Sequence, residues 1–185
     1  MIIDKHLPQG PDRAAEIASE RFLLRPMRRS DTGLIELYAG DERVARMTRD
    51  IPHPLPPGTV ESLLRTAVDP EHSVDVWVID GARLGHAEVM GILKLERMDR
   101  QQSEIRFWVA PAFWNAGIAT AAVEALLAAN PHGATQVFAE VFQDNPGSAR
   151  VLTNAGFDYL GDAEAFCVAR GAIVRTWTYS RRMGA

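Results

Sequence analysis

A strand, a long helix and a second strand follow one another between residues 104 and 142, and this order constrains the fold more than any other feature of the sequence. Residues 116–129 are rich in Ala, Leu and Val and form the strongest predicted helix. An apolar strand is predicted on each side of it, at 104–109 and 136–142. Such a connection is right-handed and joins parallel strands of one sheet. The pattern therefore predicts at least one parallel pair and a mixed α/β fold.

The chain before this unit predicts antiparallel strands. Val74, Val76 and Val78 alternate with other residues in the period-two pattern of a strand, and Asp80-Gly81 follows as a turn. With short connections to 89–95 and 104–109, these segments predict a meander. The other expected elements are a strand at 21–25, helices that begin at Ser30 or Asp31 and at Thr59, a helix at 145–155, and strands at 157–160, 166–168 and 173–179.

Length and composition favour one soluble domain. The chain has 185 residues, 46% hydrophobic and 24% charged, and no apolar run long enough to span a bilayer. Residues 1–19 are expected to be a polar extension with a short helix at 12–19, and 20–185 a single domain. No secretory signal precedes it, so a cytoplasmic protein without membrane partners is expected. A net charge of −4 without a basic block argues against nucleic acid as the main ligand.

The residues that usually bind metals are too sparse and scattered to predict a metal site. The single cysteine, Cys167, cannot form a disulfide framework, and its apolar neighbours predict a buried structural thiol rather than a reactive one. The histidines show no metal-ligand spacing.

The turn that opens the central helix is a candidate anion site. The first N–H groups of a helix lack internal partners and, with the helix dipole, favour phosphate. Gly117 and Ala119 leave room for a phosphate near the backbone. The alternative is a turn that uses glycine only for its conformational freedom. The sequence matches neither the P-loop nor the Gly-x-Gly-x-x-Gly pattern.

The helix expected at 145–155 has clear boundary residues. Asn145 at the N-cap, Pro146 at the first helical position and Gly156 beyond the end fit the preferences of helix termini. On these local grounds alone, Asn145 and Ser148 serve only to satisfy the start of the helix.

Taken together, these segments resemble the acetyl-CoA signature of the GNAT superfamily of N-acetyltransferases, most of all its ribosomal-protein alanine N-acetyltransferase branch. The resemblance implies a central, mixed and mostly antiparallel sheet of about seven strands flanked by about four helices. The pieces that carry it, in order along the chain, are 20–26, 104–109, 113–120 and 145–157.

The resemblance also implies a binding site for acetyl-CoA as co-substrate, without a metal. Backbone N–H groups of the turn would wrap the pyrophosphate, and the strand Phe107 to Val109 would lie along the pantetheine arm, with an N–H near Val109 facing the thioester oxygen. Asn145 would approach the pantetheine. The residues implied in cofactor binding are Phe107, Trp108, Val109, Trp114, Asn115, Ala116, Gly117, Ile118, Ala119, Thr120, Asn145 and Ser148.

The implied reaction is direct attack of an amine in a ternary complex, with no acyl-enzyme. An ammonium must first lose a proton, and a carboxylate acting through water can accept it. The resemblance assigns this role to Glu104, whose alternative is an exposed strand charge paired with Arg106 or Arg97. Many relatives carry a tyrosine acid where this chain has Leu152. Ser148 is then expected near the coenzyme sulfur, where it stabilises the thiolate.

The acceptor is expected to be a primary amine, either a protein N-terminus or a small molecule. Its pocket is expected to involve the proline-rich loop 51–57, the helices beside it and the Arg170-Gly171 turn. His53 and Trp77 are candidate lining residues, but a solvated His53 and a core Trp77 are favoured. A non-catalytic acyl-CoA-binding regulatory module and a plain structural domain are the alternative functions. Homodimers are common among such relatives.

Overall fold

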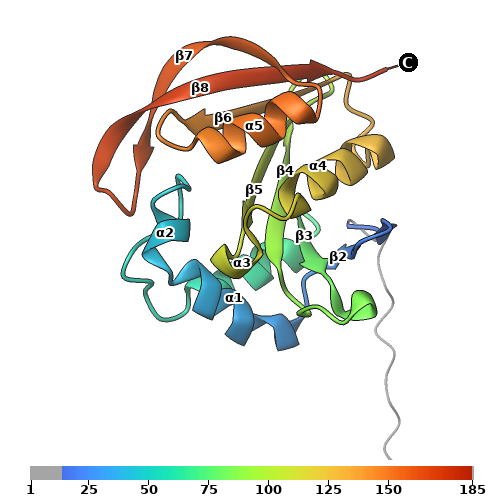
Figure 1. The fold of residues 1–185 in the computed structure, drawn as a ribbon, viewed down its shortest axis with the longest axis vertical. Helices are drawn as coiled ribbons and strands as arrows, with labels where there is room; N and C mark the ends of the chain where they lie inside the picture. The colour runs from blue at the N-terminus through green and yellow to red at the C-terminus, as the bar shows by residue number, and fades with distance from the viewer. Residues whose placement is uncertain (1–13, 185) are drawn as a thin grey trace, which may run out of the picture.

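The computed structural model describes residues 14–184, which form one eight-stranded sheet with five α-helices (Figure 1). The strands are β1 (Ile17–Ala18), β2 (Leu23–Pro26), β3 (Val74–Asp80), β4 (Gly91–Met98), β5 (Gln102–Val109), β6 (Gln136–Phe142), β7 (Asp158–Cys167) and β8 (Ala172–Arg182). The helices are α1 (Thr32–Ala39), α2 (Glu42–Ala45), α3 (Thr59–Val68), α4 (Ile118–Ala129) and α5 (Pro146–Asn154).

The strands lie in the order β1-β2-β3-β4-β5-β6-β8-β7, and β5–β6 is the one parallel pair of the described sheet. The predicted mixed, mostly antiparallel sheet is therefore confirmed, with one strand and one helix more than the approximate numbers expected. The helix predicted at 12–19 is wrong over its described part. Residues 12 and 13 lie outside the described residues, and Ile17–Ala18 instead pairs with Leu23 and Leu24 of β2. Tertiary pairing to an existing strand outweighs the weak local preference for helix.

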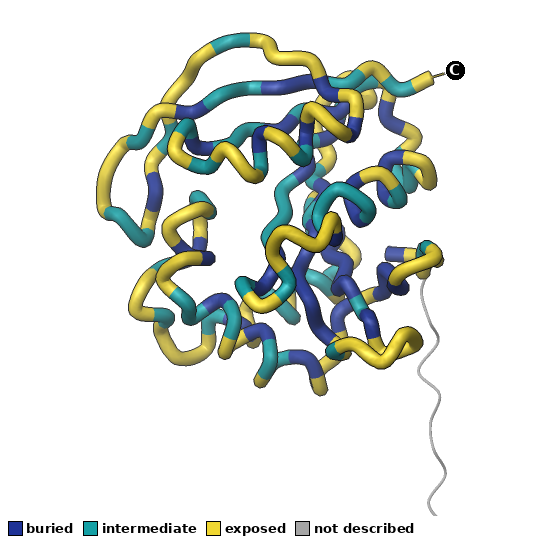
Figure 2. Tube along the Cα trace, in the orientation of Figure 1, coloured by how far each residue is buried: buried dark blue, intermediate teal, exposed yellow. Residues whose placement is uncertain are grey.

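Helices cover both faces of the sheet, and strand alternation separates two cores. On β3, Trp77 and Ile79 point into the cluster that includes the buried residues of α4 and α5. Val76 and Val78 point the other way, into a cluster with α1 and α3. Figure 2 shows the buried strands in the middle of the molecule and exposed helix surfaces around them.

The C-terminal part of the sheet is a long hairpin rather than separate short strands. The sequence predicted strands at 157–160, 166–168 and 173–179, but β7 is continuous and pairs with β8 from Asp158↔Ser180 to Cys167↔Ala172. Residues 161–165 contain Gly, Asp, Glu and Ala, which are rare in strands. Pairing with β8 stabilises the strand in spite of these residues.

The parallel pair of β5 and β6 is short, and this fact creates the site. The two strands pair only from residues 102–104 to residues 136–138. Beyond that point β5 continues to Val109 and β6 to Phe142 without pairing to each other. The N-termini of α4 and α5 follow the ends of these two strands, and both helices lie on the same face of the sheet beside the diverging strands (Figure 1).

Candidate active site

A large cavity of about 590 Å³ lies where β5 diverges from β6, beside the starts of α4 and α5. This volume is within the range of small-molecule sites. Of the residues that the resemblance assigned to the cofactor, all but Ala116 line it, namely Phe107, Trp108, Val109, Trp114, Asn115, Gly117, Ile118, Ala119, Thr120, Asn145 and Ser148.

The turn before α4 has a left-handed backbone at two positions. Gly117 has φ 72° and Asn115 has φ 59°. Glycine adopts this region freely, and asparagine is among the few other residues that tolerate it. Ala121 N–H is the first of the helix to have an intrahelical partner, the Gly117 carbonyl at 3.1 Å. The preceding residues 118–120 all line the cavity, so this helix start can donate to an anion there.

Basic side chains surround the same turn. The Nη2 of Arg21 donates to the Ala116 carbonyl at 2.6 Å, so Ala116 supports the turn without lining the cavity. Arg43 lies 5.7 Å from the centre of the Trp114 ring and, with Arg150, lines the cavity. The guanidinium groups of Arg43 and Arg150, which line the cavity, suit a ligand that carries phosphates.

Along the edge of β5 that is not paired with β6, the backbone groups of Phe107 and Val109 face the large cavity. Ala110 N–H donates to the Met90 carbonyl at 2.8 Å, on the β4 side. The indole Nε1 of Trp114 donates to the Val109 carbonyl at 2.7 Å. Because neighbouring residues of a strand direct their backbone groups to opposite sides, Phe107 and Val109 face away from β4. Their N–H groups are available to a ligand laid along the strand.

The start of α5 fixes Ser148 by two hydrogen bonds. Asn145 Oδ1 accepts from the Ser148 N–H at 3.3 Å, and Asn145 Nδ2 donates to Ser148 Oγ at 2.9 Å. Because the hydroxyl oxygen accepts from Asn145, its own proton is left to donate into the cavity. Leu152, one turn further on, is fully buried in the core. Ser148 thus presents a hydroxyl group to the cavity, whereas Leu152 presents none.

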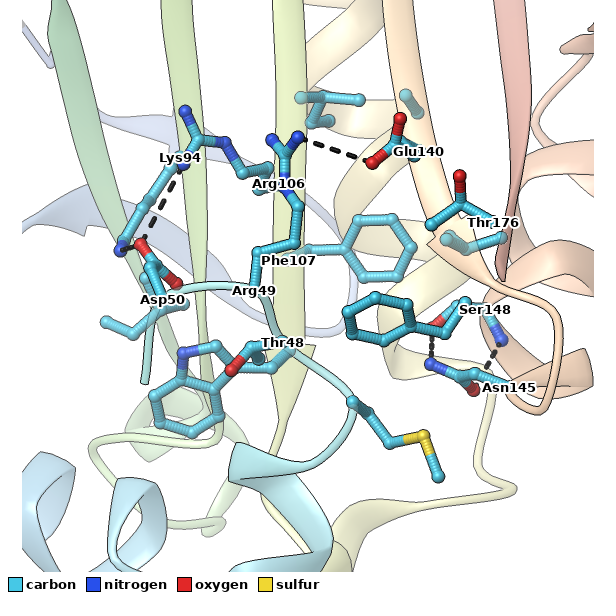
Figure 3. Close-up of a pocket in the computed structure, with 17 residues that line it drawn as sticks. Thr48, Arg49, Asp50, Lys94, Arg106, Phe107, Glu140, Asn145, Ser148 and Thr176 are labelled. Atoms are coloured by element: carbon cyan, nitrogen blue, oxygen red, sulfur yellow. Dashed lines mark hydrogen bonds and ion pairs between the residues drawn. The ribbon is translucent and has the colours of Figure 1, made fainter. Parts of the chain in front are cut away.

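A second, smaller cavity of about 50 Å³, drawn in Figure 3, shares lining residues with the large one. It lies on the side of the 47–50 segment and is lined also by β4, β5, β6 and Thr176. The residues that line both cavities, and so mark their junction, are Met47, Phe107, Trp108, Asn145 and Ser148.

The small cavity has a charged wall. Arg49 reaches across the divergence of the strands and forms ion pairs with Glu104 of β5 and, at 3.4 Å, with Glu140 of β6. Burial raises the pKa of Glu140, Arg49 opposes this rise and the Glu104 charge adds to it. The Thr176 side chain is buried in the same cavity wall, and its interaction with the Glu140 carboxylate also opposes the rise in pKa.

A second group of charges continues from this wall. Asp50 lies 3.1 Å from Lys94, and Arg106 pairs with Glu96. Although burial favours the neutral form of Asp50, the charges of Lys94 and Arg106 hold its pKa below the usual value. Asp50 is therefore ionised and saturated by cations, which makes it a weak proton acceptor.

The expected base, Glu104, lies behind this wall. It lines neither cavity, and its carboxylate pairs with Arg49 and lies 3.8 Å from Arg106 Nε. Sequence reasoning anticipated Arg106 as a partner but missed Arg49 and Glu140. A charged residue inside the apolar run 137–142 was the available signal for Glu140.

Trp77 belongs to the core and His53 is solvated, which are the positions that the sequence favours for both. Trp77 is fully buried, and its Nε1 donates to the Ala15 carbonyl at 3.0 Å, so it belongs to the core. His53 is exposed, and neither the loop 51–57 nor the Arg170-Gly171 turn lines either cavity. Ile51 and Leu55 of the loop pack into the cores instead, because burial of apolar side chains fixes the loop against the sheet.

The β7–β8 hairpin holds the segment that closes the small cavity. Arg170 donates to the Arg46 carbonyl at 3.0 and 2.7 Å and pairs with Asp144. Val168 N–H donates to the Arg49 carbonyl at 3.1 Å, and the buried thiol of Cys167 donates to the Thr48 carbonyl at 3.3 Å. The burial predicted for Cys167 is confirmed. The Arg170 turn does not line the small cavity itself. It holds the 46–49 segment, of which Met47, Thr48 and Arg49 line the cavity.

Residues 14–184 contain neither a cluster of metal ligands nor a membrane-spanning helix. In this part of the chain, no group of three or more His, Cys, Asp and Glu side chains is arranged to hold a metal ion. No described helix combines the length and apolar character needed to cross a membrane.

Comparisons with known proteins agree with this geometry. Residues 21–158 match the acetyltransferase (GNAT) domain family. A comparison with curated protein sequences gives no significant match. The chain belongs to the GNAT acetyltransferase family, because the match covers well over half of its length. Its class is therefore that of the acyltransferases that use acetyl-CoA.

Solved structures share the fold at low sequence identity. A GNAT-family acetyltransferase from Bacillus anthracis has a TM-score of 0.77 at 16% identity, over 91% of this chain and 99% of that one. A spermidine N-acetyltransferase from Vibrio cholerae, in complex with CoA and spermine, has a TM-score of 0.74 at 15% identity, over 89% and 97%. A ribosomal-protein-S5-alanine acetyltransferase from Vibrio fischeri has a TM-score of 0.74 at 19% identity, over 91% and 97%.

Proposed function

We propose that this protein transfers the acetyl group of acetyl-CoA to a primary amine by direct attack in a ternary complex, in the cytoplasm. The observation that carries the proposal is the pair of adjoining cavities, which meet at Met47, Phe107, Trp108, Asn145 and Ser148. The large one offers backbone donors and guanidinium groups to the coenzyme, and the small one offers the Glu140 carboxylate to an ammonium. The acetyl group would cross from one to the other at their junction.

The residues in the large cavity would each have a defined task. The N–H groups at the start of α4 would bind the pyrophosphate, and the β5 edge would hold the pantetheine arm. The Val109 N–H would donate to the thioester oxygen and stabilise the oxyanion of the tetrahedral intermediate. The Ser148 hydroxyl, oriented by Asn145, would donate a hydrogen bond to the departing thiolate.

The acceptor is an amine of unassigned size. The spermidine and ribosomal-protein acetyltransferases with this fold take their names from a small polyamine and a protein, respectively. Both substrates present a primary amine, and the small cavity near Glu140 has room for an ammonium group and little else. Its volume is a few times the 10–15 Å³ that one water requires.

A regulatory module that binds acyl-CoA without turnover is the second candidate. The buried Leu152 at the place of the usual tyrosine acid favours it. The charged wall of the small cavity favours the enzyme, because a module that only binds coenzyme has no need of a second, carboxylate-lined cavity.

Two measurements test the proposal. Calorimetric titration measures the binding of acetyl-CoA, and thiol release measures turnover with spermidine, butylamine and a peptide that has an N-terminal alanine. Binding with turnover on at least one amine is expected. Binding without turnover on any of them would favour the regulatory module, and a folded protein that does not bind acetyl-CoA would refute both functions.

A further inference from the structure

Arg170 lies in the turn between β7 and β8, and its guanidinium joins two distant parts of the chain. Nη1 and Nη2 donate to the two carboxylate oxygens of Asp144, at 2.6 and 3.0 Å. Nε and Nη2 donate to the Arg46 carbonyl at 3.0 and 2.7 Å, and the guanidinium carbon lies 5.1 Å from the centre of the Phe142 ring. The side chain is only 12% exposed, although the residue belongs to a hairpin turn. All three nitrogens of the guanidinium are thus engaged by Asp144 and Arg46.

The two groups that Arg170 binds belong to the walls of different cavities. Asp144 lies between β6 and α5 and lines the large cavity. The Arg46 carbonyl begins the segment of which Thr48 and Arg49 line the small cavity. Arg170 itself lines neither cavity. It therefore supports the walls of both cavities from outside.

The position of the 46–49 segment depends on the hairpin. No helix or strand includes this segment, which follows α2. The hairpin binds it at three backbone carbonyls, those of Arg46, Thr48 and Arg49. Figure 1 shows the end of the hairpin beside α2 and the residues that follow it. Because β7 and β8 pair with each other along their whole length, loss of the Arg170 side chain should loosen the segment and leave the sheet intact.

Asp144 places a carboxylate in the wall of the cavity proposed for a polyanionic coenzyme. Its hydrogen bonds from Arg170 hold its pKa below the usual range, so it is ionised. An unpaired carboxylate there would repel phosphate groups, and such repulsion is stronger beside a protein than in bulk water. Arg170 offsets this charge, while Arg43 and Arg150 remain to attract the phosphates.

We infer that Arg170 is a positioning residue with two separable tasks: its charge neutralises Asp144 beside the coenzyme, and its planar guanidinium fixes the 46–49 segment beside the acceptor. This inference rests on the proposed acetyltransferase function. Lysine can supply the charge but not the geometry, since a compact ammonium cannot reproduce the bidentate contact and the bonds to a carbonyl together. The two tasks are therefore open to separate tests.

The test compares Arg170→Lys, Arg170→Gln and the double variant Arg170→Gln/Asp144→Asn with the wild-type protein. Arg175→Lys and Glu164→Gln, two exposed changes of the same kind on the hairpin, are the controls and should match wild type. Calorimetry measures the affinity for acetyl-CoA. Thiol release at saturating acetyl-CoA measures kcat and KM for butylamine and for a peptide that has an N-terminal alanine.

The two ligands should respond differently to these variants. Arg170→Gln should weaken acetyl-CoA binding by about threefold, because it leaves the Asp144 charge unpaired. It should raise the KM of the amine by about tenfold, with a smaller change in kcat, because the acceptor wall loses its support. Arg170→Lys should bind acetyl-CoA like wild type and still raise the KM of the amine. The double variant should regain the affinity for acetyl-CoA and keep the raised KM.

A role in stability alone would not give this pattern, because removal of a second side chain would not repair the binding of one ligand and leave the other impaired. Wild-type affinity for acetyl-CoA and wild-type KM for the amine in Arg170→Gln would overturn this inference alone. Parallel losses for both ligands in all three variants would also overturn it. No turnover by wild-type protein that binds acetyl-CoA would overturn the proposed function, and with it the task assigned to Arg170 on the acceptor side.

Discussion

Arg49 Nη1 lies 3.4 Å from the carboxylate of Glu140, a contact between residues 91 positions apart in the chain. It joins a loop after α2 to β6 across the gap where β5 and β6 diverge. The same guanidinium also holds Glu104. One cation thus pairs with two carboxylates, one on each of the diverging strands.

Replacing Arg49 with Met should move the pH profile of kcat/KM to higher pH. Arg49 lowers the pKa of Glu140, so its loss leaves burial and the Glu104 charge to raise that pKa further. The acid limb of the profile should shift accordingly, while acetyl-CoA affinity is retained. Arg83→Met, an exposed change of the same kind, is the control. An acid limb that stays in place in Arg49→Met would mean that Glu140 does not produce that limb.

Glu140→Gln should raise the melting temperature at neutral pH and not in acid. The folded-state pKa of Glu140 is raised above its unfolded value of about 4.3, so its proton is bound more tightly when the chain is folded. Its favourable contribution is complete below the unfolded pKa and is lost as pH rises through the folded pKa.

Thermal melts of wild type and Glu140→Gln between pH 4 and 8 measure this effect. The difference in melting temperature should grow with pH in favour of the variant, whereas Glu164→Gln should give a difference that does not change. A stabilisation of Glu140→Gln that is largest in acid would mean that the direction of the pKa change is wrong.

Gly117→Glu should weaken acetyl-CoA binding at least about tenfold, or ~1.4 kcal/mol. The new side chain would occupy a left-handed position, and a carboxylate at the helix start would repel the pyrophosphate. Gly85→Glu is the matched control, since Gly85 also has positive φ but faces open space outside the cavity. Calorimetry should show equal binding in the control and in wild type.

Asp31→Ala should destabilise the fold by about 3–5 kcal/mol. Asp31 and Arg25 are each 1% exposed and form a bidentate pair with both distances 2.8 Å. Removing Asp31 leaves the buried guanidinium with Asp80 as its remaining carboxylate partner. Urea unfolding measures the loss, and a destabilisation below about 1 kcal/mol, the value of a surface pair, would mean that the pair is solvated in solution.

The features that local patterns determine were predictable from the sequence. β6 was predicted at 136–142 and is observed there, and Gly156 ends its helix in the left-handed conformation as expected. Apolar periodicity and glycine conformation depend on neighbouring residues, which a single sequence contains. The parallel pairing of β5 and β6 was predictable because the connecting helix restricts the alternatives.

The charged wall of the small cavity was not predictable in this way. Arg49 is 55 residues from Glu104 and 91 from Glu140, and no local pattern relates them. Their meeting depends on the hairpin, which holds the 46–49 segment, and the hairpin itself was divided into shorter strands in the prediction. Long-range pairing decided both features, so the sequence indicated the coenzyme side of the site better than the acceptor side.

The burial of Cys167 under the 46–50 segment makes the only thiol of the chain a kinetic reporter. A thiol reagent reaches it only when the hairpin separates from the Thr48 carbonyl and exposes the sulfur. The rate of labelling therefore measures how often the hairpin and the 46–50 segment separate, and the measurement needs no substrate. While the segment stays closed, the protein adds no background to an assay that detects released coenzyme thiol.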